Sequence, residues 1–174
     1  MKIVETRKVA YAVVLVALGV ILAPYTSIPI GIARVNPTQH LINVIAAVLL
    51  GPWYAVTVAL VISIIRNAQG VGTLLAFPGS MIGALLAGYT FKILRNVYGA
   101  ALAEIIGTGI LGSLVAVYLV APIFMGRPTE LGVLMASFLG STIVGSVIGV
   151  AALKVLARAG YAPALKTPAK PGAP

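Results

Sequence analysis

Long apolar runs separated by short polar stretches make up most of this chain. Four of them are easily delimited, at residues 9–23, 74–91, 100–121 and 131–156. A helix needs about 20 mainly apolar residues to cross a hydrocarbon layer of about 30 Å. The first run is shorter, and the other three are near or above that length. Each of the four predicts a membrane-spanning helix.

A fifth apolar run, residues 41–65, contains Gly51 and Pro52 at its middle. It predicts either one helix kinked at the proline or two short helices that turn there. The basic residues distinguish these alternatives. Two short helices give six spans and place nine Lys and Arg residues on one side of the membrane and three on the other, whereas one kinked helix divides them five against seven. The nine are Lys2, Arg7, Lys8, Lys92, Arg95, Lys154, Arg158, Lys166 and Lys170, and the three are Arg34, Arg66 and Arg127.

Because cytoplasmic loops carry the excess of Lys and Arg, this asymmetry favours six helices with both termini in the cytoplasm. The second and third helices are then unusually short. Residues 41–50 reach only about 15 Å at the standard helical rise, so this pair must lean on its neighbours.

The two ends of the chain predict different behaviour. Residues 1–158 are expected to form one six-helix membrane domain. Residues 159–174 contain four prolines and two lysines and predict a disordered cytoplasmic tail. The basic start and apolar run at residues 9–23 also resemble a signal peptide, but no small-x-small cleavage site follows Pro24, and we interpret the run as a retained helix.

Composition supports the membrane assignment. The chain is 60% hydrophobic and 9% charged, with a mean hydropathy of +1.10. Its net charge of +9 comes from basic residues between the apolar runs, which is typical of contact with lipid headgroups and not with nucleic acid. There are no cysteines, so disulfides and thiolate metal sites are excluded.

The sequence lacks the motifs that would indicate an enzyme or a cofactor site. It has no phosphate-binding Gly-x-x-x-x-Gly-Lys-Ser/Thr loop, no His-Glu-x-x-His and no Gly-x-Ser-x-Gly. Three acidic residues offer little material for paired-carboxylate or two-metal chemistry. We therefore expect no catalysis, no metal and no cofactor, and active transport would need a partner or an ion gradient.

Small residues recur at four-residue spacing in the last three predicted helices. Such spacing lets helix backbones approach closely in lipid, so we expect these three helices to form the tight half of the bundle. The residues are Gly79, Gly83 and Ala87, then Thr108, Gly112 and Ala116, then Ser137, Ser141, Gly145 and Gly149.

Polar and aromatic side chains collect on the predicted outer face. Hydrogen-bonding groups beside aromatic rings predict a site for a small, flat, polar molecule, although a channel or an enzyme would also gather such groups. A histidine at a helix start is often simply hydrated, and Arg66 and Asn67 would also suit a helix C-terminus. The candidate site residues are Gln39, His40, Asn43, Arg66, Asn67, Phe77 and Ser80.

Glu104 is the one acidic residue inside an apolar run. It lies about 9 Å past the start of its run at Tyr98, towards the cytoplasmic end. Carboxylates within a membrane are functional candidates, so Glu104 joins the candidate site. A structural ion pair with Lys92 or Arg95 is an equally good interpretation.

Three segments occur in order along the chain: QHLINVIAAVLLGPWYA, IRNAQGVGTLLAFPGSMIGALLAG and AEIIGTGILGSL. Together they resemble the ThiW-type S component of energy-coupling-factor (ECF) transporters. The resemblance implies a six-helix protein of the cell membrane with cytoplasmic termini. It also implies a substrate-binding subunit that captures a thiamine precursor, hydroxyethylthiazole, outside the cell, then docks on a transmembrane T component with two ATPase subunits.

The resemblance leaves several points open. S components often dock through an Ala-x-x-x-Ala face on the first helix, and this chain instead has Ala10 and Ala17 seven positions apart. The ligand is thiazole, its phosphate or whole thiamine. A solitary secondary transporter or channel, in which Glu104 carries protons, is the main alternative, and a structural subunit without a ligand is another.

Overall fold

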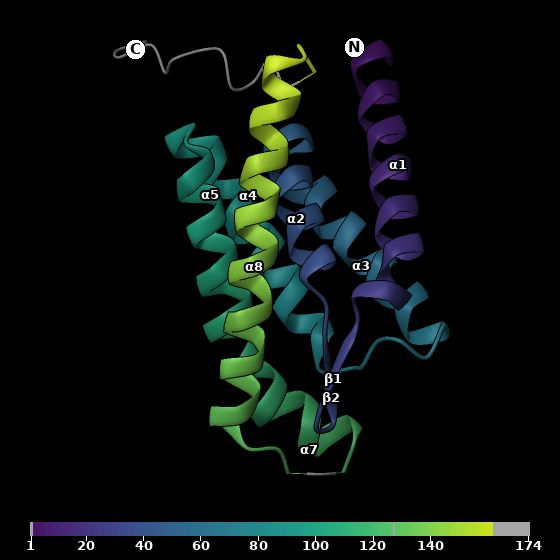
Figure 1. Cartoon of the computed structure of the whole chain (residues 1–174), viewed down its shortest axis with the longest axis vertical. Helices are drawn as coiled ribbons and strands as arrows, with labels where there is room; N and C mark the ends of the chain where they lie inside the picture. Colours follow the sequence, from purple (N-terminus) through teal and green to yellow (C-terminus); the bar gives the residue numbers. More distant parts are fainter. Residues whose placement is uncertain (1, 127, 162–174) are drawn as a thin grey trace.

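The structure is a computed structural model that describes residues 2–126 and 128–161. Its described part is a bundle of helices with one small β-hairpin, which confirms the prediction of an all-α membrane protein (Figure 1). The fifth segment is continuous but includes two stretches with π-helical hydrogen bonding, η1 and η2. In chain order the elements are α1 (Lys2–Thr26), β1 (Ile28–Ile30), β2 (Ala33–Val35), α2 (Pro37–Leu50), α3 (Pro52–Ala68), α4 (Ala76–Leu94), α5 (Val97–Glu104), η1 (Ile105–Gly112), α6 (Ser113–Val115), η2 (Ala116–Val120), α7 (Ala121–Phe124) and α8 (Leu131–Arg158).

Four of the described segments are long and apolar enough to cross a membrane. They are Glu5–Thr26, Ala76–Leu94, Val97–Phe124 and Leu131–Arg158, and they contain the four long apolar runs of the sequence. The helices α2 and α3 are apolar but shorter. The fold is therefore that of an integral membrane protein with a short second and third helix.

The fifth apolar run turns at Gly51 and does not continue as one kinked helix. Gly51 has φ 92° and ψ 176°, a conformation that is open essentially only to glycine. Pro52 follows as the first residue of α3, where its missing N–H leaves no helix bond unmade. Gly51 and Pro52 let α3 turn back along α2, so that the two helices form an antiparallel pair.

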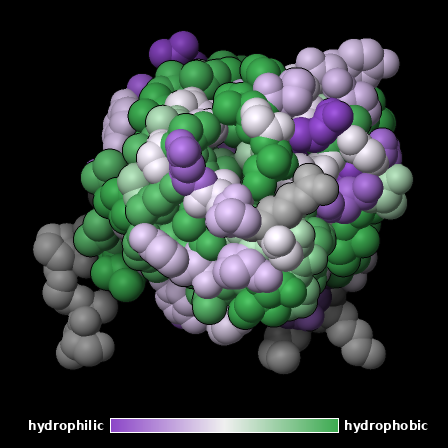
Figure 2. Space-filling model, turned by 90° about the horizontal axis from the view of Figure 1, so that it is seen from below, coloured by the Kyte–Doolittle hydropathy of each residue, from purple (hydrophilic) through white to green (hydrophobic). Residues whose placement is uncertain are grey.

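The two ends of the bundle differ in their elements and in their charge. The start of α1 and the end of α8 lie at one end, here called the termini end, and the β-hairpin and α7 lie at the other, here called the hairpin end (Figure 1). Seen from the hairpin end, polar residues are scattered among apolar ones (Figure 2). Basic residues with described side chains concentrate at the termini end, namely Arg7, Lys8, Lys92, Arg95, Lys154 and Arg158, whereas Arg34 and Arg66 lie near the hairpin end.

The helix α2 forms the centre of the bundle. It packs against α1, α3, α4 and α8, and most of its side chains are buried. The predicted close packing is present between α4 and η1, where Gly79 and Gly83 meet Gly112 and Gly107. The helix α8 also packs on η1, but its Gly145 and Gly149 face the first turns of α2. The small-residue pattern did not indicate the central place of α2. The helix α1 packs mainly along α2 and α3, and among the described residues it is the least buried of the long helices.

The predicted tail, residues 159–174, lies outside the described residues except for its first three. The helix α8 ends at Arg158, where the predicted membrane domain ends. Arg127, predicted on the outer face, is also outside the described residues.

Candidate functional site

The candidate site begins where the hairpin leads into α2. Asn36 caps this helix, because its side-chain oxygen accepts a hydrogen bond of 3.2 Å from the backbone N–H of Gln39, and Pro37 occupies the first helical position. The amide nitrogen of Asn36 donates to the carbonyl of Ala23, 3.2 Å away, and so joins the end of α1 to the start of α2. These contacts fix the first turns of α2, which carry the polar side chains.

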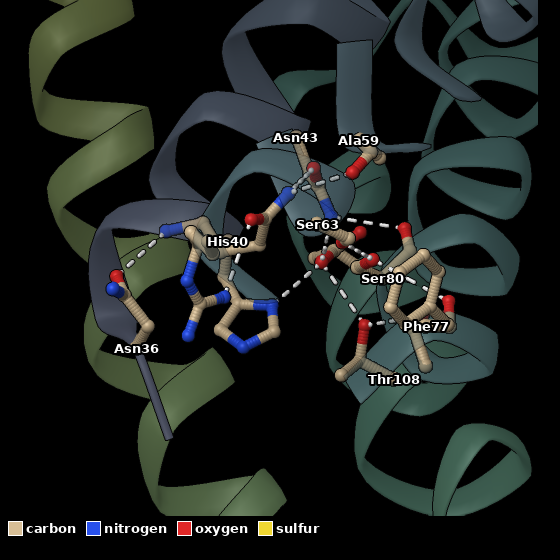
Figure 3. Close-up of polar contacts among 12 residues, drawn as sticks. Asn36, His40, Asn43, Ala59, Ser63, Phe77, Ser80 and Thr108 are labelled. Atoms are coloured by element: carbon tan, nitrogen blue, oxygen red, sulfur yellow. Dashed lines mark hydrogen bonds and ion pairs between the residues drawn. The ribbon is translucent and has the colours of Figure 1, made fainter. Parts of the chain in front are cut away.

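Gln39, His40 and Asn43 lie on the buried side of α2. All three are nearly or fully inaccessible to solvent. Since an unpaired polar group within a membrane is costly, each needs partners from neighbouring helices. The partners come from α3, α4 and the fifth segment, so a polar cluster forms inside the bundle (Figure 3).

Glu104 is the centre of this cluster. Its Oε1 lies 3.0 Å from each of three donors, the Nδ1 of His40, the Nδ2 of Asn43 and the Oγ1 of Thr108 (Figure 3). The Thr108 hydroxyl also lies 2.9 Å from the carbonyl oxygen of Gly79. One fully buried carboxylate oxygen thereby links α2 to the fifth segment, and hydrogen bonds to a carboxylate are among the stronger ones in proteins.

The suggested ion pair of Glu104 with Lys92 or Arg95 is wrong. Both basic side chains are exposed at the termini end, and the ionisable group that contacts Glu104 among the described residues is His40, at 3.0 Å. The sequence predicts that Glu104 lies near the cytoplasmic surface, within reach of Lys92 and Arg95. In the structure Glu104 instead contacts the first turns of α2. Because α2 is short and lies at the centre of the bundle, its polar first turns lie at the same level as Glu104.

The second oxygen of Glu104, Oε2, is buried without a hydrogen-bond partner in the described structure. It packs against Gly83 of α4, where a Cβ atom would lie 2.5 Å from Oε2. Glycine at this position therefore makes room for the carboxylate. Gly107 approaches the Cα of Gly83 from η1, which brings the two backbones into contact beside Glu104.

A second set of contacts extends the cluster towards α3. The Nε2 of Gln39 donates to the Oδ1 of Asn43 at 3.4 Å and to the carbonyl of Ala59 at 3.5 Å. Its Oε1 accepts from the buried guanidinium of Arg66, also at 3.4 Å. Arg66 donates as well to the carbonyl of Val71, 3.3 Å away. Gln39 thus connects the Glu104 cluster to Arg66.

A narrow cavity lies beside the cluster, towards the hairpin end. Its volume is about 10 Å³, which is about the minimum for one water molecule. The cavity is lined by Arg34 and Val35 of β2, Asn36, Gln39 and His40 at the start of α2, Arg66 of α3, Ala76 and Ser80 of α4, Thr108 of η1 and Phe138 of α8.

Four predicted site residues line the cavity: Gln39, His40, Arg66 and Ser80. Two more lie directly behind its wall, because Glu104 and Asn43 contact His40 and Ser80 without lining the cavity themselves.

Asn67 and Phe77 are placed differently. The amide of Asn67 donates to the carbonyls of Ser63 and Thr73 and so shapes the loop after α3. Phe77 is half-buried and is not among the residues that line the cavity, and its carbonyl accepts from the Ser80 hydroxyl.

The sequence reasoning did not single out Phe138 or Thr108 as site residues. Phe138 supplies the aromatic ring of the cavity, from the buried face of α8 that also carries Ser141, Thr142 and Gly145. That spacing of 3, 4 and 7 positions was a readable signal, since it marks one helix face. Thr108 was noticed only as a small packing residue.

Most of the chain is similar to one known protein family. Residues 9–159, which include every described element that forms the cavity, match the family described as "Thiamine-precursor transporter protein (ThiW)". No similar curated protein and no similar solved structure was found. The match covers most of the chain and agrees with the multi-pass, largely helical structure. The chain therefore belongs to the ThiW family of thiamine-precursor transporters.

Proposed function

We propose that this protein is the substrate-binding S component of an ECF-type transporter and that it captures hydroxyethylthiazole in the cavity at the hairpin end. The observation that carries the proposal is the buried triad of donors around Glu104, which orients His40 at the cavity wall. The excess of basic residues at the termini end supports an orientation in which the hairpin end faces outward.

The contact of His40 with Glu104 indicates which hydrogen-bonding group the ligand needs. With Glu104 ionised and His40 neutral, the Nδ1 of His40 would donate to the carboxylate, which only accepts hydrogen bonds. The other nitrogen, Nε2, would then be an acceptor, and it points away from Glu104 (Figure 3). A ligand hydroxyl, such as that of hydroxyethylthiazole, would satisfy this acceptor, while Phe138 offers an aromatic surface for the ring.

The size of the ligand affects how far the cavity must open. Sites for small molecules usually enclose about 300–1,000 Å³, whereas this cavity, at about 10 Å³, has room for about one water molecule. Binding must therefore displace part of its wall, and a single thiazole ring would need a smaller displacement than whole thiamine. Arg34 and Val35 of the β-hairpin form the wall at the hairpin end.

Uptake would draw its energy from partners. The chain carries no phosphate-binding loop, so ATP hydrolysis would come from two ATPase subunits joined through a transmembrane T component. The exposed face of α1 is a suitable docking surface, since Ala10 and Ala17 both lie on it. Small residues there would let a partner helix approach closely.

Calorimetry of the purified protein tests the ligand assignment. Hydroxyethylthiazole should bind more tightly than whole thiamine, and ethylthiazole, which lacks the hydroxyl, should bind about tenfold more weakly because it leaves Nε2 of His40 unsatisfied. Equal affinity for all three compounds would contradict the assignment. Thiazole phosphate should be included, because Arg34 and Arg66 at the cavity would tolerate a phosphate.

A second candidate function is proton-coupled transport by this chain alone. It is favoured by one observation, the direct contact of two ionisable groups, His40 and Glu104, inside the bundle. Proteoliposomes that contain only this chain separate the two functions. An S component should bind the precursor without accumulating it, whereas a proton-coupled transporter should accumulate it when a pH gradient is imposed.

A further inference from the structure

A second hollow lies at the termini end, at the opposite end of α2 from the cavity. It is lined by α1, the α2–α3 turn and the end of α4, and its volume is about 450 Å³. We call it the basic recess. Its principal lining residues are Lys8, Pro52, Trp53, Phe91, Lys92 and Arg95.

The recess exists because α2 and α3 are short. With 14 residues, α2 is about 21 Å long, whereas α1, with 25 residues, is about 38 Å long. The α2–α3 turn therefore ends below the level that α1 reaches (Figure 1). The turn is held there by α4, since Gly88 packs directly on Pro52 and any side chain at position 88 would collide with it.

The charge of the recess is of one sign. Lys8, Lys92 and Arg95 line it, and no acidic residue does. The chain has three acidic residues. Glu5 is near this end, but it is exposed on α1 and does not line the recess. Glu104 lies in the bundle interior, and Glu130 lies at the start of α8. The recess is therefore complementary to an anion.

Aromatic side chains lie beside the cations. The Nζ of Lys8 is 5.8 Å from the ring centroid of Tyr54, and the guanidinium carbon of Arg95 is 6.0 Å from that of Phe91. Trp53 is two-thirds exposed at the edge of the recess. Tryptophan and tyrosine are typical of the headgroup level of a bilayer, where cations meet lipid phosphates.

From this geometry we propose that the basic recess binds the headgroup of an anionic phospholipid of the inner leaflet. The three cations contact the phosphate region, and the acyl chains leave the recess past Trp53 into the bilayer. The site is separate from the thiamine-precursor cavity. It would anchor the turn that α2 and α3 share.

Trp53 provides the test, because it is the single tryptophan of the chain. The full-length protein is reconstituted with phosphatidylglycerol or phosphatidylcholine that carries brominated acyl chains, which quench tryptophan fluorescence on contact. Brominated phosphatidylglycerol should quench Trp53 at a mole fraction several times lower than brominated phosphatidylcholine does. Equal quenching curves for the two lipids would overturn the proposal.

A matched pair of variants locates the effect. The recess variant K8Q/K92Q/R95Q and the control variant R7Q/K154Q/R158Q each lose three positive charges at the termini end. The recess variant should lose the preference for phosphatidylglycerol, and the control should keep it. Loss of the preference in both variants would show a general surface charge effect, and loss in neither would show that the three recess cations do not bind the lipid. Either result would overturn the assignment to the recess.

Two further outcomes exclude other occupants. Inorganic phosphate at millimolar concentration should not displace brominated phosphatidylglycerol, and full displacement would indicate a site for free phosphate. If the recess variant keeps its lipid preference but no longer assembles with energising subunits, the recess is a protein contact and the lipid proposal fails. Because the wild-type quenching comparison needs no variant, the proposal remains testable if a triple variant folds poorly.

Discussion

His40 and Glu104 lie 64 positions apart in the chain, and the Nδ1 of one is 3.0 Å from the Oε1 of the other. The contact joins the first turns of a short central helix to the point where the fifth segment changes from α-helical to π-helical hydrogen bonding. Changes of this kind are frequent at functional sites. The contact ties the packing of the bundle to the orientation of a side chain that lines the cavity.

Replacement of Glu104 by alanine should destabilise the protein and weaken precursor binding. The three donors that share Oε1 would lose an acceptor, and for His40 no other acceptor for Nδ1 is present among the described contacts. Asn43 and Thr108 keep acceptors at the carbonyls of Ser80 and Gly79. Leaving the buried Nδ1 of His40 unpaired costs about 1–3 kcal/mol, so the unfolding midpoint in detergent should fall by several degrees. Glu104→Gln retains an acceptor oxygen and should fall between alanine and wild type. A wild-type midpoint for Glu104→Ala would contradict the central role of the carboxylate.

Replacement of His40 by alanine should affect only ligands that carry a hydroxyl. The loss of one hydrogen bond should lower the affinity for hydroxyethylthiazole about tenfold. Ethylthiazole cannot donate to Nε2, so its affinity should change little in the same variant. Calorimetry with both ligands on both proteins isolates the hydroxyl contact, and an equal loss for the two ligands would place the hydroxyl elsewhere.

The Gly83→Ala variant should be less stable than wild type by about 1–3 kcal/mol, as expected for overpacking. Its Cβ would lie 2.5 Å from the Oε2 of Glu104, and the facing backbone at Gly107 leaves no room to retreat. Gly140 in α8 is the matched control, since a Cβ there meets nothing within 4 Å. Gly140→Ala should be neutral or stabilising by up to about 1 kcal/mol. Thermal unfolding of the two variants should shift in opposite directions or by clearly different amounts.

The orientation of the protein can be checked with single cysteines, because the natural sequence has none. Ile32 is exposed on the β-hairpin, and Ala159 is exposed just after α8. In intact cells a membrane-impermeant maleimide should label Ile32→Cys and should label Ala159→Cys only after the membrane is opened. The reverse pattern would place the cavity on the cytoplasmic side and would contradict capture from outside.

Much of the architecture could be predicted from local signals. The long apolar runs depend on residues close together in the chain. The turn at Gly51 and Pro52 is a local signal as well, and the distribution of basic residues along the whole chain favours it over a single kinked helix. The partners of Glu104 could not be read in this way. They depend on how deep α2 lies in the bundle, which is set by packing among helices far apart in sequence.

Some site residues could likewise be found from local sequence signals, and others could not. Gln39 and His40 were found because they stand out as polar groups at the start of an apolar run. Phe138 and Thr108 were missed because an aromatic or a threonine in a membrane helix is unremarkable until its neighbours are known. Asn67 was selected for its polarity, but its amide bonds backbone carbonyls of its own loop.

The helix α2 has a further consequence for how the two faces of the membrane communicate. Eleven of its 14 residues are buried, so it packs against neighbouring helices along most of its length. His40 lies near the start of this helix, and Gly51 follows its last residue. A shift of the turn at Gly51 along the helix axis would therefore either carry His40 with it or disturb the packing of α2 against its neighbours.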